Sequence, residues 1–411
     1  MEYIGNPHHG LKFIHVGGTS GKGSTTRFIS SILESQGLKV GAFYSPHIYT
    51  IRERIQFNND IISDSEFADI FNYIDGKVQK FVQVTKNRPL TYFEILFAMA
   101  IVYFVEKKVD VAVIEVGLGG KLDATNVIYS QIAVLTNVSL DHTHILGDTV
   151  EEILNDKKEI IKKDSTVVTG VIQSNLKYIL KKHAKKQNSE IFLIDEDIKF
   201  EIKKESFNDF VFSYEYDGLK LDNLSIRMIG YHQVLNAVLA LTAALTFMSK
   251  LKRTLNYDRL CKFIAEVRLP GRIEVQSQKP LIIWDAAHNQ EKMSALTDVI
   301  DKYTEDRIHL LVAVKKGQDV YDIFKTWQIL SHRIDQIVLT QYVTSQDVRI
   351  ESENLELYLP QFKSMFPDTE VVLQSDALKA YDFLQSQLVE GSMMIVTGSF
   401  YLFSYLGGKG C

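Results

Sequence analysis

Short apolar runs alternate with longer amphipathic stretches in the N-terminal part of the chain. Residues 13–16 and 40–44 are predicted to be strands, and residues 22–35 between them show the periodicity of a helix. Residues 111–115 and 132–137 are continuous apolar runs, which are typical of central strands in a parallel sheet that is covered on both faces. This alternation of strand and helix indicates βαβ units and therefore an α/β fold.

Two short polar motifs predict where helices begin. Ser63 and Glu66 have the spacing of a capping box, and so do Thr91 and Glu94. The helix that follows Thr91 carries apolar residues on most of its faces between residues 95 and 105. We therefore expect this helix to be buried.

The pattern changes near residue 200. Residues 200–216 alternate aromatic and polar side chains, which predicts antiparallel strands at a sheet edge, and residues 231–251 predict a long helix. A new alternation then begins, so we place a boundary near residues 266–269, between domains of residues 1–267 and 268–411. The strands predicted in the second domain are residues 281–284, 309–314, 336–340, 370–373 and 393–396.

Composition narrows the class of protein. Of the 411 residues, 45% are hydrophobic and 24% are charged, as in soluble globular proteins. A net charge of −5 argues against a nucleic-acid partner, and two cysteines fit a reducing cytoplasm. We expect no signal peptide and no membrane span, because no uninterrupted apolar stretch reaches about 20 residues. We also expect a monomer.

A glycine-rich segment follows the first predicted strand and precedes the first helix. Glycines let backbone N–H groups face phosphate oxygens, and the helix N-terminus adds its positive dipole end. We predict that Lys22 reaches the outer phosphates of ATP and that Ser24 offers its hydroxyl to Mg²⁺. Gly23 separates these two residues, unlike the pattern G-x-x-x-x-G-K-[ST], so a flexible turn is the alternative. The nucleotide-binding residues predicted here are Thr19, Ser20, Gly21, Lys22, Gly23 and Ser24.

The Gly-Lys-Gly-Ser variant of this loop is characteristic of the Mur ligase superfamily, and within it the chain resembles the folylpolyglutamate and dihydrofolate synthases. The likeness recurs in order along nearly the whole chain, which is far more specific than any one motif. The motifs are residues 44–47 (Tyr-Ser-Pro-His), 52–55 (Arg-Glu-Arg-Ile), 91–94 (Thr-Tyr-Phe-Glu), 115–126 (Glu-Val-Gly-Leu-Gly-Gly-Lys-Leu-Asp-Ala-Thr-Asn), 140–143 (Leu-Asp-His-Thr), 270–272 (Pro-Gly-Arg) and 285–289 (Asp-Ala-Ala-His-Asn).

The resemblance implies a P-loop Mur-ligase-type ATPase domain with a mainly parallel sheet, followed by a smaller Rossmann-like α/β domain. It also implies ATP-dependent addition of L-glutamate to a folate, and possible use of dihydropteroate, through an acyl phosphate. A carboxylate does not react with an amine in water at useful rates, so it first attacks the γ-phosphate of ATP. Lys22 and Mg²⁺ would neutralise the charge of the triphosphate.

Magnesium is expected where the strand of residues 111–115 ends. Glu115 ends this strand, and the resemblance implies that Glu115, Ser45 and His142 are ligands together with Ser24 of the loop. A histidine ligand is unusual because Mg²⁺ prefers oxygen. The alternatives are a solvated carboxylate for Glu115 and a polar loop position for His142.

The resemblance further implies that Lys157 carries CO2 as a carbamate, which converts a cation into an anionic oxygen ligand near the metal. Carbamylation needs a neutral amine and hence a depressed pKa, which burial or nearby cations produce. The alternative is a solvated lysine on a charged helix face. Lys158 and Glu159 stand where the family usually has Ala-Gly, which favours this alternative.

Further along the chain, the resemblance implies that Asn236 and Arg272 contact the nucleotide. A planar guanidinium suits phosphate recognition. Asp285 and His288 would lie between the domains, near the nucleotide and the incoming glutamate. The alternative for these two residues is an ordinary strand-to-helix turn, with Asn289 as the helix cap.

The substrate is expected on the basic side of the first domain. By resemblance, Arg52, Arg54 and Asp123 hold a pterin-type substrate, and a local basic pocket suits the glutamate tail of a folate. A charged surface hairpin is the alternative for the two arginines. We also predict that Ser399 and Tyr401, after the last strand, help to bind the amino acid.

Two other functions stay open from the sequence. One is a different Mur-type ligase that acts on a nucleotide-linked cell-wall precursor, and the motifs at residues 91–94 and 117–126 favour folate over it. The other is a non-catalytic nucleotide-binding module, and the presence of every expected ATP- and metal-binding side chain argues against it. Ser20, Ala286 and residues 315–319 depart from the family pattern and leave the exact acceptor open.

Overall fold

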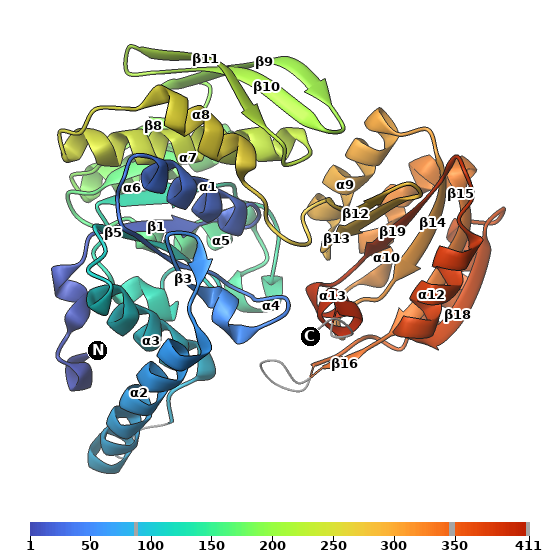
Figure 1. The fold of residues 1–411 in the computed structure, drawn as a ribbon, viewed down its shortest axis with the longest axis horizontal. Coiled ribbons are helices and arrows are strands. Elements are labelled where there is room, and N and C mark those ends of the chain that lie inside the picture. The colour runs from blue at the N-terminus through green and yellow to red at the C-terminus, as the bar shows by residue number, and fades with distance from the viewer. Residues whose placement is uncertain (86–88, 345–349, 408–411) are drawn as a thin grey trace.

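The computed structural model describes residues 1–85, 89–344 and 350–407. These residues form two lobes that lie side by side in Figure 1, each built around its own large sheet. The N-terminal lobe contains an eight-stranded sheet, and the C-terminal lobe contains a six-stranded sheet. Helices alternate with strands in both lobes, so the predicted α/β class is confirmed.

The first sheet has the strand order β4-β3-β2-β5-β1-β6-β7-β8, and every pairing from β2 through β8 is parallel. Its central strands β1, β5 and β6 are buried along their whole length, as their continuous apolar runs predict. The strands are β1 (Phe13–Gly17), β2 (Val40–Phe43), β3 (Ile55–Phe57), β4 (Asp60–Ile61), β5 (Val111–Glu115), β6 (Ile132–Leu135), β7 (Thr166–Thr169) and β8 (Glu190–Leu193).

Helices cover both faces of this sheet. Ile14 and Val16 of β1 point toward α1 and α7, whereas Phe13 points toward α2 and α3 on the opposite face, which α5 and α6 also cover. The predicted capping boxes form at the starts of α2 and α3. The helices are α1 (Lys22–Ser35), α2 (Asp64–Thr85), α3 (Tyr92–Glu106), α4 (Thr143–Leu146), α5 (Val150–Lys157), α6 (Ser174–Lys186), α7 (Tyr231–Lys250) and α8 (Tyr257–Glu266).

Among the described residues, α7 is the one helix long and apolar enough to cross a membrane. However, 78% of its apolar window is buried inside the protein. Its side chains belong to the same apolar cluster as those of α1 and of β6. α7 is therefore a core helix of the N-terminal lobe.

The strands after β8 form a sheet of their own. β9 (Ile198–Ser206), β10 (Asp209–Tyr216) and β11 (Leu219–Ile226) pair antiparallel and lie above α7 and α8 in Figure 1. The prediction of antiparallel strands is confirmed, and β9 lies at an edge of this three-stranded sheet whereas β10 is its central strand. The apolar face of these strands packs onto α7, where the hydroxyl oxygens of Tyr214 and Thr242 are 2.8 Å apart.

The second sheet has the strand order β12-β13-β19-β14-β15-β18, in which only β12 pairs antiparallel among these described strands. α9, α10 and α11 cover one face and α12 and α13 the other, which matches the Rossmann-like domain expected here. The strands are β12 (Glu274–Gln278), β13 (Leu281–Asp285), β14 (Arg307–Val312), β15 (Ile334–Gln341), β18 (Glu370–Asp376) and β19 (Ser392–Thr397), with a small pair β16 (Val343–Thr344) and β17 (Ile350–Glu351). The helices are α9 (Gln290–Tyr303), α10 (Val320–Phe324), α11 (Leu359–Met365), α12 (Ala377–Gln387) and α13 (Phe400–Gly407).

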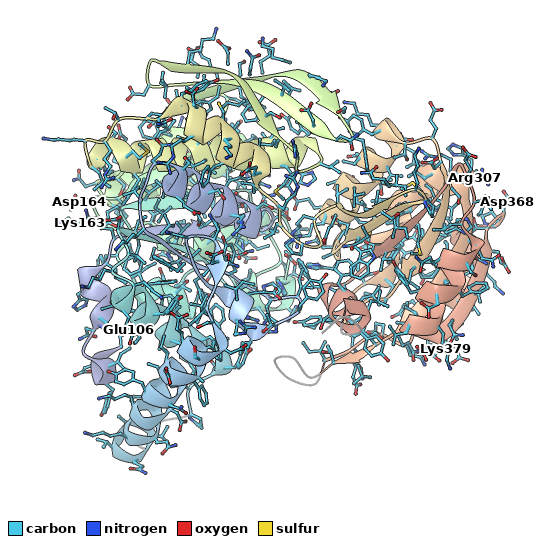
Figure 2. All side chains as sticks on the ribbon, viewed as in Figure 1. Glu106, Lys163, Asp164, Arg307, Asp368 and Lys379 are labelled. Carbon is cyan, nitrogen blue, oxygen red and sulfur yellow. The ribbon has the colours of Figure 1, made fainter. Side chains whose placement is uncertain are left out.

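The segment between α8 and β12 connects the two lobes. Figure 2 shows charged side chains such as Lys163, Arg307 and Lys379 pointing outward at the outer edges of the lobes. Several charged side chains are buried instead, among them Arg54, Glu115, Lys157 and Asp285. Because burying a charge is costly unless it is paired or functional, these residues direct attention to the region between the lobes.

Candidate active site

The glycine-rich segment forms the turn from β1 into α1 and is held against the end of β6. The Thr19 N–H donates to the Asn137 carbonyl oxygen at 3.0 Å. The Ser20 N–H donates to the Asn137 side-chain oxygen at 2.8 Å. The neighbouring strand therefore sets the path of the loop, which argues against a flexible turn and favours a phosphate-binding loop.

Gly21 lets the loop approach α7 closely. Its φ is +81°, and a Cβ atom at this position would lie 2.2 Å from the side-chain oxygen of Asn236. Asn236 is buried and donates to the Gln233 side-chain oxygen at 3.1 Å. The loop and α7 line a cavity of about 550 Å³, here called the junction cavity, whose lining includes Ser20, Gly21, Ser24, Asn236, Arg272 and Asp285.

Two lysines from distant parts of the chain converge on the loop. The Lys22 ammonium donates to the Gly18 carbonyl oxygen at 3.1 Å, and the Lys157 amine donates to the same oxygen at 3.0 Å. Lys157 is only 3% exposed, so the alternative of a solvated lysine is wrong. Burial, reinforced by nearby Lys22, lowers the pKa of Lys157 to about 7.

Because Gly120 has no side chain, the end of α5 can pack closely against it, which places Lys157 beside the phosphate loop. A Cβ atom on Gly120 would lie 2.8 Å from the carbonyl oxygen of Lys157 and 2.9 Å from that of Asp156. We expect Gly120→Ala to lower the free energy of unfolding by about 1–3 kcal/mol and to reduce activity, because backbone atoms must move apart. Denaturant unfolding and steady-state kinetics measure both effects.

Gly76→Ala is the matched control for this substitution. Gly76 lies within α2, and a Cβ atom there meets nothing within 4 Å. Alanine favours a helix over glycine by about 1 kcal/mol, so this variant should be as stable as the parent or more stable. Equal stability of the two variants would contradict the proposed close approach at Gly120.

Oxygen atoms gather where β5 ends. The Ser45 N–H donates to Glu115 Oε2 at 3.0 Å, and a Cβ atom on Gly23 would lie 3.4 Å from both carboxylate oxygens of Glu115. Burial raises the pKa of Glu115, and nearby Lys22 opposes this shift. A buried carboxylate next to Gly23 and Ser45 fits Mg²⁺, which favours hard oxygen ligands and keeps phosphate and water in its shell.

His142 lies apart from this oxygen cluster. It precedes α4 with a φ of 49°, and its side chain is 44% exposed and 3.9 Å from an Asp141 carboxylate oxygen. Ser45 and His142 line the same cavity. In the described residues, no three His, Cys, Asp or Glu side chains form a metal cluster by themselves.

The C-terminal lobe contributes Arg272 and Asp285 to the junction cavity. Asp285 accepts hydrogen bonds from the backbone N–H groups of Ile273 and Ala287, both at 2.8 Å, and so fixes the chain around Arg272. Burial raises the pKa of Asp285 to about 6, although Arg272 opposes the shift. The Arg272 guanidinium lies 4.6 Å from the centre of the Phe400 ring.

His288 follows Asp285 in a strand-to-helix turn. Its Nδ1 is 2.8 Å from the Ala286 carbonyl oxygen, so Nδ1 carries the proton because a carbonyl can only accept. Burial, with nearby Lys292, lowers the pKa of His288 well below its ordinary value. Asn289 caps α9 as the alternative interpretation predicted, so the turn is both a helix start and part of the site.

Sequence reasoning missed Glu291 and Lys292, which begin α9 and line the junction cavity. Glu291 accepts hydrogen bonds from Asn137 Nδ2 at 2.6 Å and from Ser20 Oγ at 3.3 Å, and also bonds the Ser139 hydroxyl. These bonds join the C-terminal lobe to the phosphate loop. The only signal in the sequence was their place just after the Asp-Ala-Ala-His-Asn motif.

A second cavity, of about 450 Å³, is lined in part by Ser45 and is here called the aromatic cavity. The buried Arg54 donates to His47 Nδ1 at 2.9 Å and lies 5.7 Å from the centre of the Tyr92 ring. Asp123 accepts hydrogen bonds from the N–H groups of Leu118 and Thr125, both at 2.9 Å. The lining residues include Arg54, Tyr92, Phe93, Asp123, His142, His288, Lys315, Ser399 and Tyr401.

Arg52 does not reach any of these cavities. Its Nε lies 2.8 Å from an Asp64 carboxylate oxygen, and its Nη1 donates to the Ile62 carbonyl oxygen at 3.0 Å. The surface interpretation therefore fits Arg52, whereas Arg54 is 3% exposed and faces the aromatic cavity. The two arginines have different positions because a short 3₁₀ helix, Ile51–Arg54, turns them in different directions.

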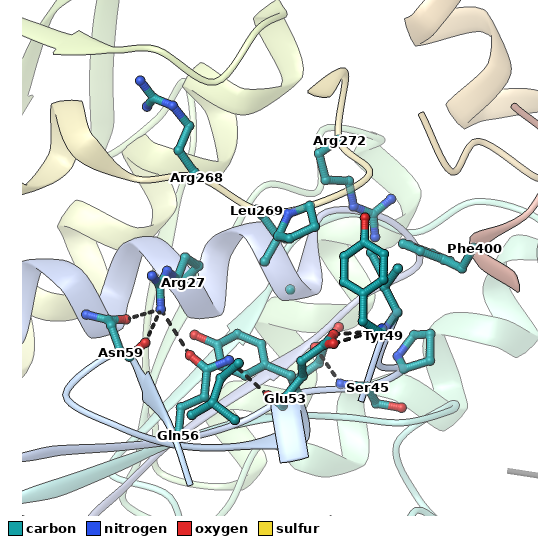
Figure 3. Close-up of a pocket in the computed structure, with 17 residues that line it drawn as sticks. Arg27, Ser45, Tyr49, Glu53, Gln56, Asn59, Arg268, Leu269, Arg272 and Phe400 are labelled. Atoms are coloured by element: carbon teal, nitrogen blue, oxygen red, sulfur yellow. Dashed lines mark hydrogen bonds between the residues drawn. The ribbon is translucent and has the colours of Figure 1, made fainter. Parts of the chain in front are cut away.

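A third cavity, of about 280 Å³, lies between α1, the segment that contains Ser45 and Tyr49, and the connection to the C-terminal lobe. Figure 3 shows Tyr49, Arg272 and Phe400 close together on one side, and Arg27 bonded to Gln56 and Asn59 on the other. Arg272 lines both this cavity and the junction cavity. The third cavity therefore adjoins the junction cavity through Arg272 and the aromatic cavity through Ser45 and Phe400.

Comparisons with known proteins agree with this arrangement. Residues 16–244 match the Mur ligase middle domain, and residues 271–400 match the Mur ligase glutamate ligase domain. The dihydrofolate synthase/folylpolyglutamate synthase of Bacillus subtilis (strain 168) is 30% identical over 410 residues, covering 98% of this chain and 91% of that protein.

Solved structures show the same fold. Folylpolyglutamate synthase of Mycobacterium tuberculosis, complexed with ADP and AMPPCP, aligns with a TM-score of 0.89 and 26% identity over 100% of this chain and 93% of that chain. An FPGS–AMPPCP–folate complex aligns with a TM-score of 0.80 and 27% identity over 99% of this chain and 92% of that chain.

A parallel-sheet lobe with a phosphate loop, joined to a second α/β lobe that completes the cavity, defines an ATP-dependent ligase of the Mur type. Within that superfamily, the chain belongs to the folylpolyglutamate synthase/dihydrofolate synthase family.

Proposed function

We propose that this protein adds L-glutamate to a folate in an ATP-dependent reaction that passes through an acyl phosphate. The protein is a glutamate ligase of the folylpolyglutamate synthase/dihydrofolate synthase type. One observation carries the proposal: Lys22 and Lys157 meet at the Gly18 carbonyl, beside a cavity that the C-terminal lobe closes. Relatives complexed with ADP, AMPPCP and folate support it.

ATP would occupy the junction cavity. Its phosphates would meet the backbone N–H groups at the start of α1 and the Lys22 ammonium, with the Arg272 guanidinium approaching from the other lobe. An oxygen of the substrate carboxylate attacks the γ-phosphorus, and the bond from that phosphorus to the bridging oxygen breaks. ADP leaves with the electron pair, so charge neutralisation by the two cations stabilises the transition state.

Ser24, Ser45, Glu115 and His142 are proposed to hold Mg²⁺, which when bound would supply charge neutralisation at the phosphate oxygens. Lys157 is proposed to carry a carbamate. Its burial and its lowered pKa support this assignment, because CO2 reacts only with the neutral amine. The carbamate would turn a buried cation into an anion beside Lys22.

The aromatic cavity is proposed to hold the pterin-type substrate. Tyr92 and Phe93 supply aromatic rings to its lining, Arg54 supplies a buried cation and Asp123 supplies a carboxylate. Ser399 and Tyr401 line the side formed by the C-terminal lobe and are proposed to bind the amino acid. Because Arg52 is engaged with Asp64, it is left out of the proposed substrate site.

Amide formation requires the glutamate amine to lose a proton as it attacks the acyl carbon and phosphate leaves. His288 is proposed to accept this proton, because its Nε2 carries the lone pair and the ring lines the aromatic cavity. Asp285 accepts two backbone hydrogen bonds, so we propose that it positions Arg272 and His288.

We further propose that residues 1–267 and 268–411 form the two domains, because each range contains one of the two large sheets. We also propose that the protein is a monomer and acts in the cytoplasm.

Glutamyl transfer is the test of this function. With ATP, Mg²⁺ and L-glutamate, we expect ADP release that depends on a folate acceptor and a gain of one glutamyl unit on that acceptor. Tetrahydrofolate and dihydropteroate are compared with no acceptor, and products are identified by mass spectrometry. A gain on dihydropteroate would assign the dihydrofolate synthase activity as well.

A uridine-nucleotide cell-wall precursor serves as the competing acceptor. If that precursor were modified while tetrahydrofolate and dihydropteroate stayed unchanged, the substrate would be that of another branch of the Mur ligases. Absence of ATP turnover with every acceptor would favour a nucleotide-binding module instead.

A further inference from the structure

Lys292 is a buried cation that the proposed mechanism does not yet use. It lies in the first turn of α9 and lines the junction cavity together with Ser20 and Arg272. Its Nζ atom is 3.1 Å from Nε2 of His288. Lys292 therefore reaches from the C-terminal lobe toward the phosphate loop of the other lobe.

The direction of this hydrogen bond follows from the tautomer of His288. Nδ1 holds the ring proton because it faces the Ala286 carbonyl, so Nε2 can only accept and the Lys292 ammonium donates. An ammonium has three donors, and this bond uses one of them. The two remaining donors are available to a ligand in the junction cavity.

The charges around Lys292 favour an anion. Burial lowers the pKa of Lys292 to about 8, Asp141 opposes the shift, and Arg272 and Lys22 strengthen it. The nearby Asp285 carboxylate is already held by two backbone N–H groups. Arg272 and Lys292 line the junction cavity and Lys22 lies near Lys292, an arrangement suited to a polyphosphate. The Glu291 carboxylate of the same lining is already bonded to Asn137 and Ser139.

Lys292 and His288 also join the linings of two cavities through their hydrogen bond. Lys292 lines the junction cavity, whereas its partner His288 lines the aromatic cavity. In the proposed reaction, the one group that moves from the nucleotide to the second substrate is the γ-phosphoryl group. A cation that lines the nucleotide cavity and bonds a residue of the second cavity is placed to contact that group before and after transfer.

We infer that Lys292 is a second phosphate-binding lysine, which binds the γ-phosphate of ATP and then the phosphate of the acyl intermediate. This inference rests on the proposed function. Lys292 forms and breaks no covalent bond: it neutralises charge while the carboxylate oxygen bonds to phosphorus and ADP departs. When its ammonium turns to the phosphate, Nε2 of His288 is released to accept the proton of the attacking amine.

Nucleotide binding separates this role from others. We expect Lys292→Met to weaken AMPPCP binding by about 10-fold or more and ADP binding by less than about 2-fold, because only AMPPCP has the third phosphate group. Calorimetric titration of the full-length protein measures both affinities. We also expect kcat to fall by about 10²-fold or more.

Lys302→Met is the matched control. Lys302 lies on the same helix, is exposed and pairs with Glu205 on the surface. This variant should bind both nucleotides as the parent does. Lys292→Arg keeps the positive charge and should retain most of the preference for AMPPCP over ADP. If Lys292→Met does not fold, the AMPPCP and ADP affinities of Lys292→Arg still test the inference.

A purely positioning role would give a different result. If Lys292 acted only by orienting His288, Lys292→Met would leave the AMPPCP-to-ADP affinity ratio unchanged and would cause no further loss of activity in a His288→Ala background. Either result would overturn the inference. Nucleotide affinities need no folate, so a failure of glutamyl transfer in the parent protein would reject the proposed function without altering this test.

Discussion

Lys22→Ala is expected to lower kcat by about 10³-fold or more while leaving the fold intact. Lys22 places its ammonium at the phosphate loop, and its neighbour Lys157 is proposed to become an anion, so no other side chain of the loop replaces its charge. ADP release with ATP, Mg²⁺, L-glutamate and the active acceptor measures the loss. Thermal unfolding shows whether the variant is folded.

Lys39→Ala is the matched control for Lys22. Lys39 is an exposed lysine directly before β2, and it lines none of the three cavities described above. This control should keep the parent turnover. Parent-like turnover in Lys22→Ala would refute the phosphate-loop assignment.

Lys157→Ala should reduce kcat by about 10²-fold or more, because it removes the proposed anionic ligand beside the metal and leaves a void at a buried position. A small carboxylate such as formate, added at high concentration, should restore part of the activity by replacing the lost anion. Lys158→Ala is the control, since the Lys158 side chain bonds Asn155 at the surface.

The same lysine predicts a pH dependence. Its pKa is lowered from 10.5 to about 7, so the neutral amine that reacts with CO2 becomes the major form above about pH 7. We expect activity with bicarbonate present to rise between about pH 6 and 8, and the rise should be absent in Lys157→Ala. An active enzyme with unmodified Lys157, shown by mass spectrometry under CO2-free conditions, would contradict the carbamate.

Stability should follow pH in the same direction. Between about pH 7 and 10.5 the unfolded chain binds a proton at Lys157 that the unmodified folded protein does not. The contribution of Lys157 to the free energy of unfolding therefore increases as pH rises through this window and is least favourable below pH 7. Urea unfolding of the CO2-free parent and of Lys157→Ala at several pH values measures this difference.

Local features of the sequence predicted the secondary structure well. α1 begins and ends at the predicted residues, because an αL glycine precedes it and its apolar periodicity is regular. The boxes at Ser63 and Thr91 start helices through bonds that span only three residues. Such interactions need no information about the rest of the fold.

Long-range packing explains the errors and omissions. The alternation in residues 200–216 shows that these strands have one apolar face, but not which element covers it, and in the structure α7 covers it. Arg52 and Arg54 belong to the same charged motif, but they lie on different sides of a short 3₁₀ helix. Arg52 pairs with Asp64 at the surface, whereas Arg54 is buried against His47. Glu291 and Lys292 become candidate site residues only because α9 faces the phosphate loop in the tertiary structure.

The sequence by itself determined the α/β class, the phosphate loop, the helix starts and the family motifs, because these depend on local periodicity, capping and short spacing. Only the tertiary structure decided that Lys157 is buried against Gly18 and that Lys292 enters the junction cavity. A lysine on a helix is solvated or buried according to what packs over it. The residue that Lys157 packs against, Gly18, is more than a hundred positions away in the sequence.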